Sequence, residues 1–170
     1  ANDGYFSDIT RTFAVGEVSD ELKTIHDTVH RANQAAHAAV KPGVTCGSVD
    51  KAARDVIDAA GYGQYFTHRL GHGLGLDGHE DPYMRGDNQQ LLEPGMTFTI
   101  EPGIYVMGKG AVRIEDDVIA TEAGVPTSTD LPRGIKATGG ELGGGAISRP
   151  HQVSRAETQL PPGHRHRRPA

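Results

Sequence analysis

The sequence predicts an α+β fold, because two amphipathic helical patterns lie near the start of the chain and short strand patterns follow them. Residues 22–40 and 49–60 repeat apolar side chains at spacings of three and four, which places these side chains on one helix face. Residues 96–100 and 111–120 are rich in β-branched and alternating apolar residues, as strands are. The two helices are therefore expected to cover a sheet.

The chain begins with a predicted strand over residues 5–15, where β-branched and aromatic residues are frequent and Asp8 stands in the middle. A carboxylate in such a strand needs a partner. Gly16 closes the strand, and Ser19 offers an N-cap with acidic residues directly after it. The first helix is expected to run from there to about Lys41.

A second helix is predicted to open at Ser48, with Gly61 as its C-terminal cap. The segment HRLGHGLGLDGHED follows at residues 68–81 and contains three histidines among four glycines. The glycines disfavour a continuous helix, so extended chain and tight loops are expected. Histidine is a common metal ligand and proton carrier, although a histidine pair in a glycine-rich loop also fits a solvated turn.

Two later strands each carry a glutamate. The strand at residues 96–100 is followed by Glu101, a Pro-Gly bend and a short extended run at 104–106. The strand at 111–120 places Arg113 and Glu115 on the same side. A charged residue within an apolar strand needs a partner or a metal, although an edge strand with one face in water would also explain these glutamates.

Composition divides the chain into two parts. Its 170 residues suit one domain with appendages. Residues 133–170 contain seven Gly, four Pro and seven basic residues against two acidic ones, with no Phe, Tyr or Trp. We therefore expect a folded domain at 1–132, with net charge −10, and a disordered basic Gly/Pro-rich tail at 133–170. The acidic domain argues against a nucleic-acid partner and suits a cation site.

Location is predicted from features that the sequence lacks. Cys46 is the single cysteine, which fits a reducing compartment. The sequence contains no apolar run long enough to span a membrane, and its first residues do not resemble a signal peptide. We expect a cytoplasmic protein without a membrane partner.

Three carboxylates and one imidazole form a candidate metal-ligand set: Asp8, His72, Glu101 and Glu115. Oxygen donors with one nitrogen suit Mn²⁺, Co²⁺ or Fe²⁺, with Zn²⁺ as an alternative, and the set lacks the thiolates of a structural zinc site. Several carboxylates can also bridge two metal ions.

These residues lie in four sequence blocks that resemble one family. The blocks are DGYFSDITRTF, HRLGHGLGLDGHE, EPGMTFTIEPGIY and VRIEDDVIATEAG. In this order they resemble the metallopeptidases that include methionine aminopeptidase, Xaa-Pro aminopeptidase and Xaa-Pro dipeptidase. The residues of these blocks are more similar to the Xaa-Pro branch than to the methionine branch. The Xaa-Pro branch consists of M24-type peptidases with the creatinase-like pita-bread fold. The resemblance implies that fold and hydrolysis of short peptides with proline in the second position.

The resemblance also assigns roles to the metal ligands. Asp8 and Glu115 match the carboxylates that bridge two metal ions, and His72 and Glu101 match ligands of one of them. Manganese is the expected metal, with cobalt, iron or zinc as alternatives. The metals would activate a water molecule and polarise the scissile carbonyl.

Three further residues receive catalytic or supporting roles from the resemblance. His79 matches the histidine that contacts the substrate, and His68 matches a supporting histidine in the same cavity. Glu101 would also transfer a proton to the leaving nitrogen. Arg113 would hold the carboxylates through charge-assisted hydrogen bonds.

One difference from the family lies before Asp8, which only seven residues precede. The family carries a further metal-binding Asp on the preceding strand. We therefore expect a catalytic domain that is incomplete at its N-terminus, with a weakened second metal site and impaired activity. The alternative is a non-catalytic peptide-binding or assembly module on the same fold. The partner is expected to be a short proline-containing peptide, and homo-oligomers are compatible with the sequence.

Overall fold

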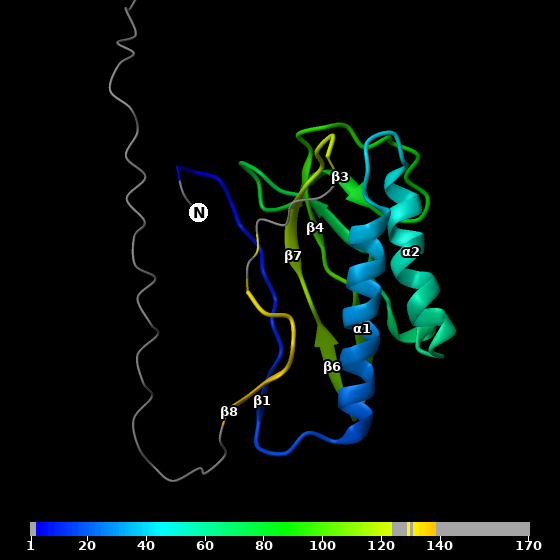
Figure 1. Ribbon diagram of the computed structural model, residues 1–170, viewed down its shortest axis with the longest axis vertical. Coiled ribbons are helices and arrows are strands. Elements are labelled where there is room, and N and C mark those ends of the chain that lie inside the picture. The colour runs from blue at the N-terminus through cyan, green and yellow to red at the C-terminus, as the bar shows by residue number, and fades with distance from the viewer. Residues whose placement is uncertain (1–2, 124–128, 130, 139–170) are drawn as a thin grey trace, which may run out of the picture.

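The computed structural model describes residues 3–123, 129 and 131–138. In this part of the chain, two long helices pack on one side of a group of short strands (Figure 1). The helices are α1 (Asp20–Ala39) and α2 (Cys46–Ala59), and a 3₁₀ turn, η1 (Gly63–Tyr65), follows them. The strands are β1 (Phe13–Val15), β2 (Gly71–Gly73), β3 (Glu80–Met84), β4 (Thr97–Ile100), β5 (Gly103–Val106), β6 (Gly110–Arg113), β7 (Asp116–Ile119) and β8 (Lys136–Thr138). The predicted α+β fold class is confirmed.

Helix α1 begins and ends close to the predicted positions. The side chain of Ser19 accepts a hydrogen bond from the backbone N–H of Leu22 at 3.3 Å, which satisfies one of the free donors of the first turn. The predicted apolar face is buried, including Ile25 and Val29. Because this pattern is local, the sequence alone is sufficient to predict the helix.

Helix α2 begins two residues before the predicted start at Ser48. Thr45 is its N-cap and accepts a hydrogen bond from the Ser48 N–H at 3.1 Å. Gly47 lies in the first turn of this helix. Glycine is needed there, because a Cβ would come within 2.6 Å of the Gly86 carbonyl oxygen. Gly61 follows the helix with φ +83°, a conformation that favours glycine, as predicted.

The central sheet has the strand order β3-β2-β4-β7, with all neighbours antiparallel. β5 pairs with β6 in a separate antiparallel pair, and β1 pairs with β8 in parallel. Helix α1 contacts β4, β5 and β6, and α2 contacts β3. The core between helices and strands contains completely buried side chains from both layers, among them Ile25, Ile57, Phe98 and Ile100. No helix among the described residues has the length and apolar character needed to cross a bilayer.

The predicted strand at residues 5–15 is regular only at its end, where Phe13–Val15 form β1. Upstream of β1, the extended chain makes scattered hydrogen bonds with loops and side chains. The Phe6 N–H donates to the Gly75 carbonyl at 2.8 Å, and the Asp8 N–H donates to the Asp117 carboxylate at 3.1 Å. Thr10 forms an isolated bridge with Glu115. The prediction of one continuous strand was therefore wrong.

The predicted strand at residues 111–120 is divided into β6 and β7. β6 pairs with β5, whereas β7 pairs with β4, so the two halves belong to different sheets. Ile114 and Glu115 lie between them and are both buried. Strands β3 and β8 were not predicted, because Pro82 interrupts the first and the second pairs with a strand far away in the sequence.

Asp116, at the start of β7, is completely buried and binds four side chains from distant segments. Its carboxylate accepts hydrogen bonds from Arg11 at 2.6 Å, Asn33 at 3.0 Å, His37 at 3.2 Å and Arg133 at 2.7 Å. Burial alone would raise the pKa of Asp116, but these hydrogen bonds hold the pKa well below its ordinary value of 3.8. The network joins β7, α1, the N-terminal segment and the chain around residue 133.

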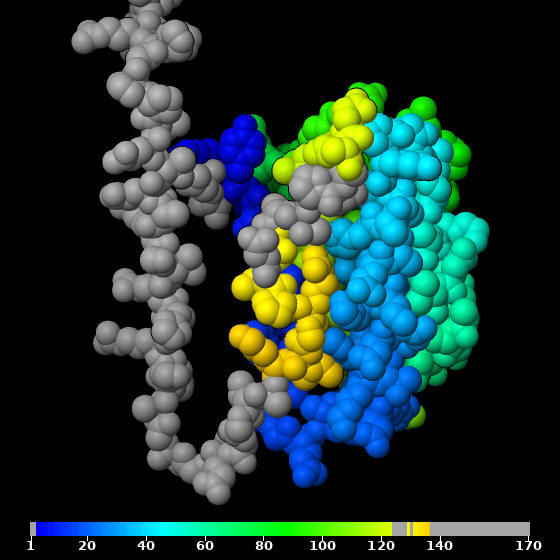
Figure 2. Space-filling model, viewed as in Figure 1, coloured from blue at the N-terminus to red at the C-terminus, as the bar shows by residue number. Residues whose placement is uncertain are grey.

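Residues 131–138 lie beside α1, which Figure 2 shows as a yellow surface against a blue one. Part of the predicted tail is therefore described: Arg133 binds Asp116, and Lys136–Thr138 form β8. Residues 139–170 of that tail lie outside the described residues. The domain boundary at residue 132 stays a prediction.

Replacing Asp116 by Ala should lower the free energy of unfolding by about 3–5 kcal/mol, because it leaves the partly buried Arg11 and Arg133 side chains without their carboxylate partner. Urea unfolding at pH 7 measures the loss. The contribution is present above about pH 4 and is lost as the pH falls further, because the folded chain binds the Asp116 proton more weakly than the unfolded chain. Asp87→Ala is the control, since that side chain is 74% exposed; its expected cost is below about 1 kcal/mol. Equal losses would contradict the role of the network.

Candidate metal centre

Strand pairing places Glu101 and Glu115 side by side. Ile100 at the end of β4 pairs with Asp116 at the start of β7. Glu101 directly follows the first strand, and Glu115 directly precedes the second. Both side chains are buried, Glu115 almost completely. The structure thus brings together the two glutamates that the sequence singled out.

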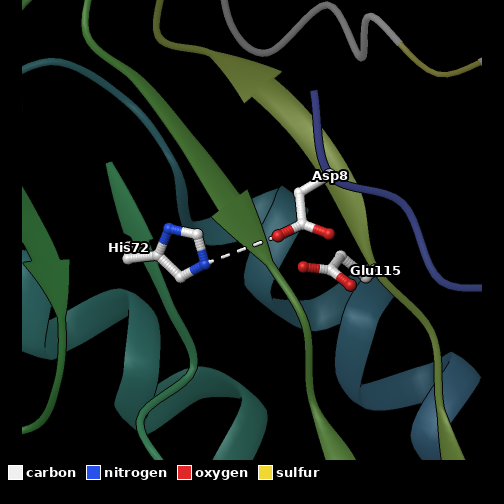
Figure 3. Close-up of side chains that lie close together, drawn as sticks. All are labelled: Asp8, His72 and Glu115. Atoms are coloured by element: carbon white, nitrogen blue, oxygen red, sulfur yellow. Dashed lines mark ion pairs between the residues drawn. The ribbon is translucent and has the colours of Figure 1, made fainter. Parts of the chain in front are cut away.

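His72 and Asp8 complete the predicted ligand set. His72 lies in β2, beside β4, and its Nε2 atom is 3.3 Å from Oε1 of Glu101 and 4.0 Å from Oδ2 of Asp8. Asp8 comes from the extended N-terminal segment. Figure 3 shows Asp8, His72 and Glu115 pointing toward one another, and each offers one ligand atom within 4.8 Å of the other two. Four residues from four separate segments therefore converge on one place.

Hydrogen bonds fix the orientation of the His72 ring. Its Nδ1 lies 3.0 Å from the carbonyl oxygen of Gly73, which can only accept a hydrogen bond, so Nδ1 carries the proton. The backbone N–H of His72 donates to the Thr99 hydroxyl at 3.1 Å, and that hydroxyl donates to Glu101 at 3.3 Å. Burial lowers the pKa of His72 and favours the neutral ring. Nε2 therefore presents its lone pair to the carboxylates.

Arg113 and Thr10 hold the two glutamates. The Thr10 hydroxyl donates a hydrogen bond to the Glu115 carboxylate. Nε of Arg113 donates to the Thr10 oxygen at 3.1 Å, while its two Nη atoms lie 3.7 Å from Glu101 and Glu115. The predicted supporting arginine therefore lies between the carboxylates.

The local charge balance is unfavourable without a further cation. Burial, followed by the nearby Glu115 charge, raises the pKa of Glu101 to about 7. Burial also raises the pKa of Glu115, against the effect of the Thr10 hydrogen bond. A positive charge between these groups would offset the cost of burying their charges and the repulsion that adds to it, and would lower both pKa values.

The residues present fit a divalent metal ion. The set supplies carboxylate oxygens from Asp8, Glu101 and Glu115 and one oriented imidazole nitrogen from His72. Metal–ligand bonds of about 2.0–2.2 Å put opposite ligand atoms at most roughly 4.4 Å apart, close to the separations observed here. Oxygen-rich donors with one nitrogen suit manganese and its neighbours better than a structural zinc site.

His79 and His68 occupy different positions. His79 is exposed, and its ring centroid lies 4.0 Å from that of His72, so it borders the ligand set. His68 is half-buried, donates from Nδ1 to the Arg69 carbonyl at 2.7 Å and accepts from the Tyr105 hydroxyl at 3.1 Å. Burial lowers the pKa of His68. Tyr105, the hydrogen-bond partner of His68, lines a surface cavity of about 390 Å³ together with Thr10 and Arg113.

Asp117 is a site residue that the sequence interpretation missed. Its carboxylate accepts the Asp8 backbone N–H, and burial together with the nearby Asp8 and Glu115 charges raises its pKa to about 6. The signal was present: in a strand, Asp117 points to the same face as Glu115, while Asp116 points to the opposite one. Thr10 and Thr99 were also missed as hydrogen-bonding partners, because hydroxyl residues carry no distinctive spacing.

Comparisons with known proteins identify the family and fold to which this chain is similar. Residues 1–122 match the model of metallopeptidase family M24. The Xaa-Pro dipeptidase of Lactobacillus helveticus is 48% identical over 135 residues, which are 79% of this chain and 37% of that protein. The solved Xaa-Pro dipeptidase from Bacillus anthracis superposes with TM-score 0.78 at 47% identity, covering 79% of this chain and 38% of that one. The X-Pro aminopeptidase from Thermotoga maritima MSB8 gives TM-score 0.78 at 44% identity, with the same coverages.

The structural matches confirm the predicted pita-bread fold, of which this chain covers a part. The chain spans about 37% of the length of curated relatives such as the L. helveticus enzyme.

Without metal, the chain should become less stable as the pH rises through the range set by Glu101. Its ordinary pKa of 4.5 is raised to about 7 in the folded state, so the folded state binds the proton more tightly. The free energy of unfolding should fall between about pH 4.5 and pH 7, by an amount on the order of 3 kcal/mol. Glu101→Gln should remove this part of the slope in urea unfolding with EDTA present. The exposed Glu93→Gln is the control. Parallel pH profiles for wild type and Glu101→Gln would contradict the burial of a charged Glu101.

Proposed function

Because the chain belongs to metallopeptidase family M24, we propose that it is a metal-dependent peptidase for short peptides with proline in the second position. The observation that carries the proposal is the convergence of Asp8, His72, Glu101 and Glu115, with the His72 lone pair aimed at carboxylate oxygens. Such a donor set is more specific than the sequence blocks, because four separate segments must fold together to make it.

The four ligands are proposed to bind the two metal ions differently. His72 and Glu101 would hold one divalent ion, and Asp8 and Glu115 would supply carboxylates to it and to a second ion. Manganese is the proposed metal, because oxygen donors predominate. Such a metal supplies an activated water molecule and a Lewis acid for the peptide carbonyl.

The chain's own residues are proposed to move the proton and to hold the substrate. Glu101 takes a proton from the attacking water and gives it to the leaving nitrogen, a role for which a positioned carboxylate is suited. His79, exposed beside His72, contacts the substrate from the open side of the site. His68 supports the site by positioning Tyr105, which lines the neighbouring surface cavity with Arg113. Arg113 keeps Glu101 and Glu115 in place.

The substrate class is supported by the names of similar proteins, an Xaa-Pro dipeptidase and an X-Pro aminopeptidase. Since the chain spans 37% of the length of the first of these, the activity of the whole relative is only a proposal for this chain. The cytoplasmic location also stays a prediction, with which the single buried Cys46 is compatible.

A direct test is alanine release by the 170-residue chain from Ala-Pro and from tripeptides that begin with Ala-Pro, with Ala-Ala as the comparison. We expect release that requires Mn²⁺, stops with EDTA and favours the proline peptides. The Xaa-Pro dipeptidase of L. helveticus serves as the positive control. Metal-dependent binding of Ala-Pro without any cleavage would instead identify a peptide-binding module.

His72→Ala and His79→Ala should separate metal binding from turnover. His72→Ala removes a metal ligand, so tight Mn²⁺ binding and hydrolysis should both be lost. His79→Ala removes a substrate contact, so Mn²⁺ affinity should stay within about threefold of wild type while turnover falls roughly 10- to 100-fold. Isothermal titration with Mn²⁺ measures the first effect and the peptide assay measures the second. Equal loss of metal in both variants would show that their roles are wrongly assigned.

A further inference from the structure

Helix α2 carries an ion pair that faces the segment before the metal centre. Asp50 is completely buried, and its Oδ2 atom accepts a hydrogen bond from Nε of Arg54, one turn later, at 2.6 Å. Nη2 of Arg54 lies 3.3 Å from the other carboxylate oxygen. The guanidinium also lies over the ring of Phe66, 4.3 Å from its centroid. The sequence shows this pair only as an ordinary i,i+4 pair on a helix.

The pair holds three backbone groups of residues 66–70. Arg54 donates one hydrogen bond to the Phe66 carbonyl at 3.1 Å and another to the His68 carbonyl at 2.5 Å. Asp50 accepts the backbone N–H of Leu70 at 2.9 Å, a donor that the Met84 carbonyl of β3 also accepts at 2.9 Å. Five N–H donors in a rigid plane allow Arg54 to bind a carboxylate and two carbonyls at once, which a lysine ammonium cannot reproduce in the same geometry.

Residues 66–70, which Asp50 and Arg54 hold, lead directly into the candidate metal centre. Leu70 is followed by β2, which carries His72. The carbonyl oxygen of Leu70 also accepts the backbone N–H of Glu101 at 2.8 Å. The backbone positions of both residues therefore depend on Leu70, which Asp50 holds from the opposite side.

Stability alone explains this arrangement poorly. Removing a carboxylate from water has a cost that its ion pair only partly offsets, so buried pairs are often no more stable than apolar replacements. The same helix shows the contrasting case: Lys51 and Asp55 have the same spacing, lie 2.6 Å apart and are both mostly exposed. Among the described residues, the side-chain hydrogen bonds of Lys51 and Asp55 join only these two residues to each other, whereas those of Asp50 and Arg54 also reach residues 66–70.

We propose that Asp50 and Arg54 are positioning residues, which set residues 66–70 so that His72 and Glu101 reach the same metal ion. The inference rests on the proposed function for its metal, but the geometry that it concerns belongs to the chain itself.

The test uses Arg54→Lys in the 170-residue chain, because lysine keeps the ion pair with Asp50 and loses the fork that binds both carbonyls. Mn²⁺ affinity should fall roughly 10- to 100-fold, the range typical for residues that orient metal ligands. In the metal-free chain, amide exchange of Leu70 and Glu101 should become at least about tenfold faster, while amides in the middle of α1 stay unchanged. Such local loosening is expected where only a few contacts are removed.

Asp55→Asn is the matched control, since it breaks the exposed pair of equal spacing on the same helix. It should leave both Mn²⁺ affinity and amide exchange at wild-type values. Asp50→Asn provides a second variant, in which the Leu70 hydrogen bond can persist but Arg54 loses its charge partner; the same two changes are expected.

Arg54→Lys with wild-type Mn²⁺ affinity and wild-type exchange at Leu70 and Glu101 would overturn the proposal. Faster exchange by the same factor throughout α1 and the sheet would also overturn it, because the pair would then act on global stability only. If the wild type itself binds no Mn²⁺, the proposed function fails. Amide exchange in the metal-free chain then still decides whether Asp50 and Arg54 hold residues 66–70 in place.

Discussion

Repulsion between carboxylates is the constraint on which the site depends. Asp8, Glu101, Glu115 and Asp117 lie close together in a partly buried place. Two such charges about 4 Å apart repel by roughly 4 kcal/mol at the effective dielectric near a protein surface. Arg113 and the surrounding hydroxyl and backbone donors offset part of this repulsion. Burial, together with the remaining repulsion, raises the pKa values of Glu101, Glu115 and Asp117, and a divalent cation is the simplest group that would offset both effects.

The register of β7 connects this constraint with the rest of the fold. Glu115 and Asp117 face the site, whereas Asp116 faces α1 and binds Asn33 and His37. A shift of one residue would exchange the two faces and bury the wrong carboxylates. The Asp116 network therefore does more than attach a helix, because its geometry determines which acidic residues reach the metal centre.

Local patterns made the helices and the candidate ligand residues predictable. The apolar stripe and Ser19 predict α1 without any tertiary information. Glu101 and Glu115 were identified because a charge within an apolar strand is unfavourable without a partner or a metal ion. What could not be predicted depends on distant partners. The strand after residue 110 divides at Glu115 because its halves pair with different strands, and β8 exists through its pairing with β1. Arg54 resembles a surface residue until the loop that it binds is known.

We propose that His72 and the neighbouring carboxylates hold a metal ion, and electron spin echo spectroscopy of Mn²⁺ bound to the chain detects a coordinated histidine nitrogen. We expect modulation from one coordinated imidazole nitrogen, a changed frequency when histidines are labelled with ¹⁵N, and no such signal in His72→Gln. Bound Mn²⁺ without nitrogen modulation, or with modulation that persists in His72→Gln, would contradict the account.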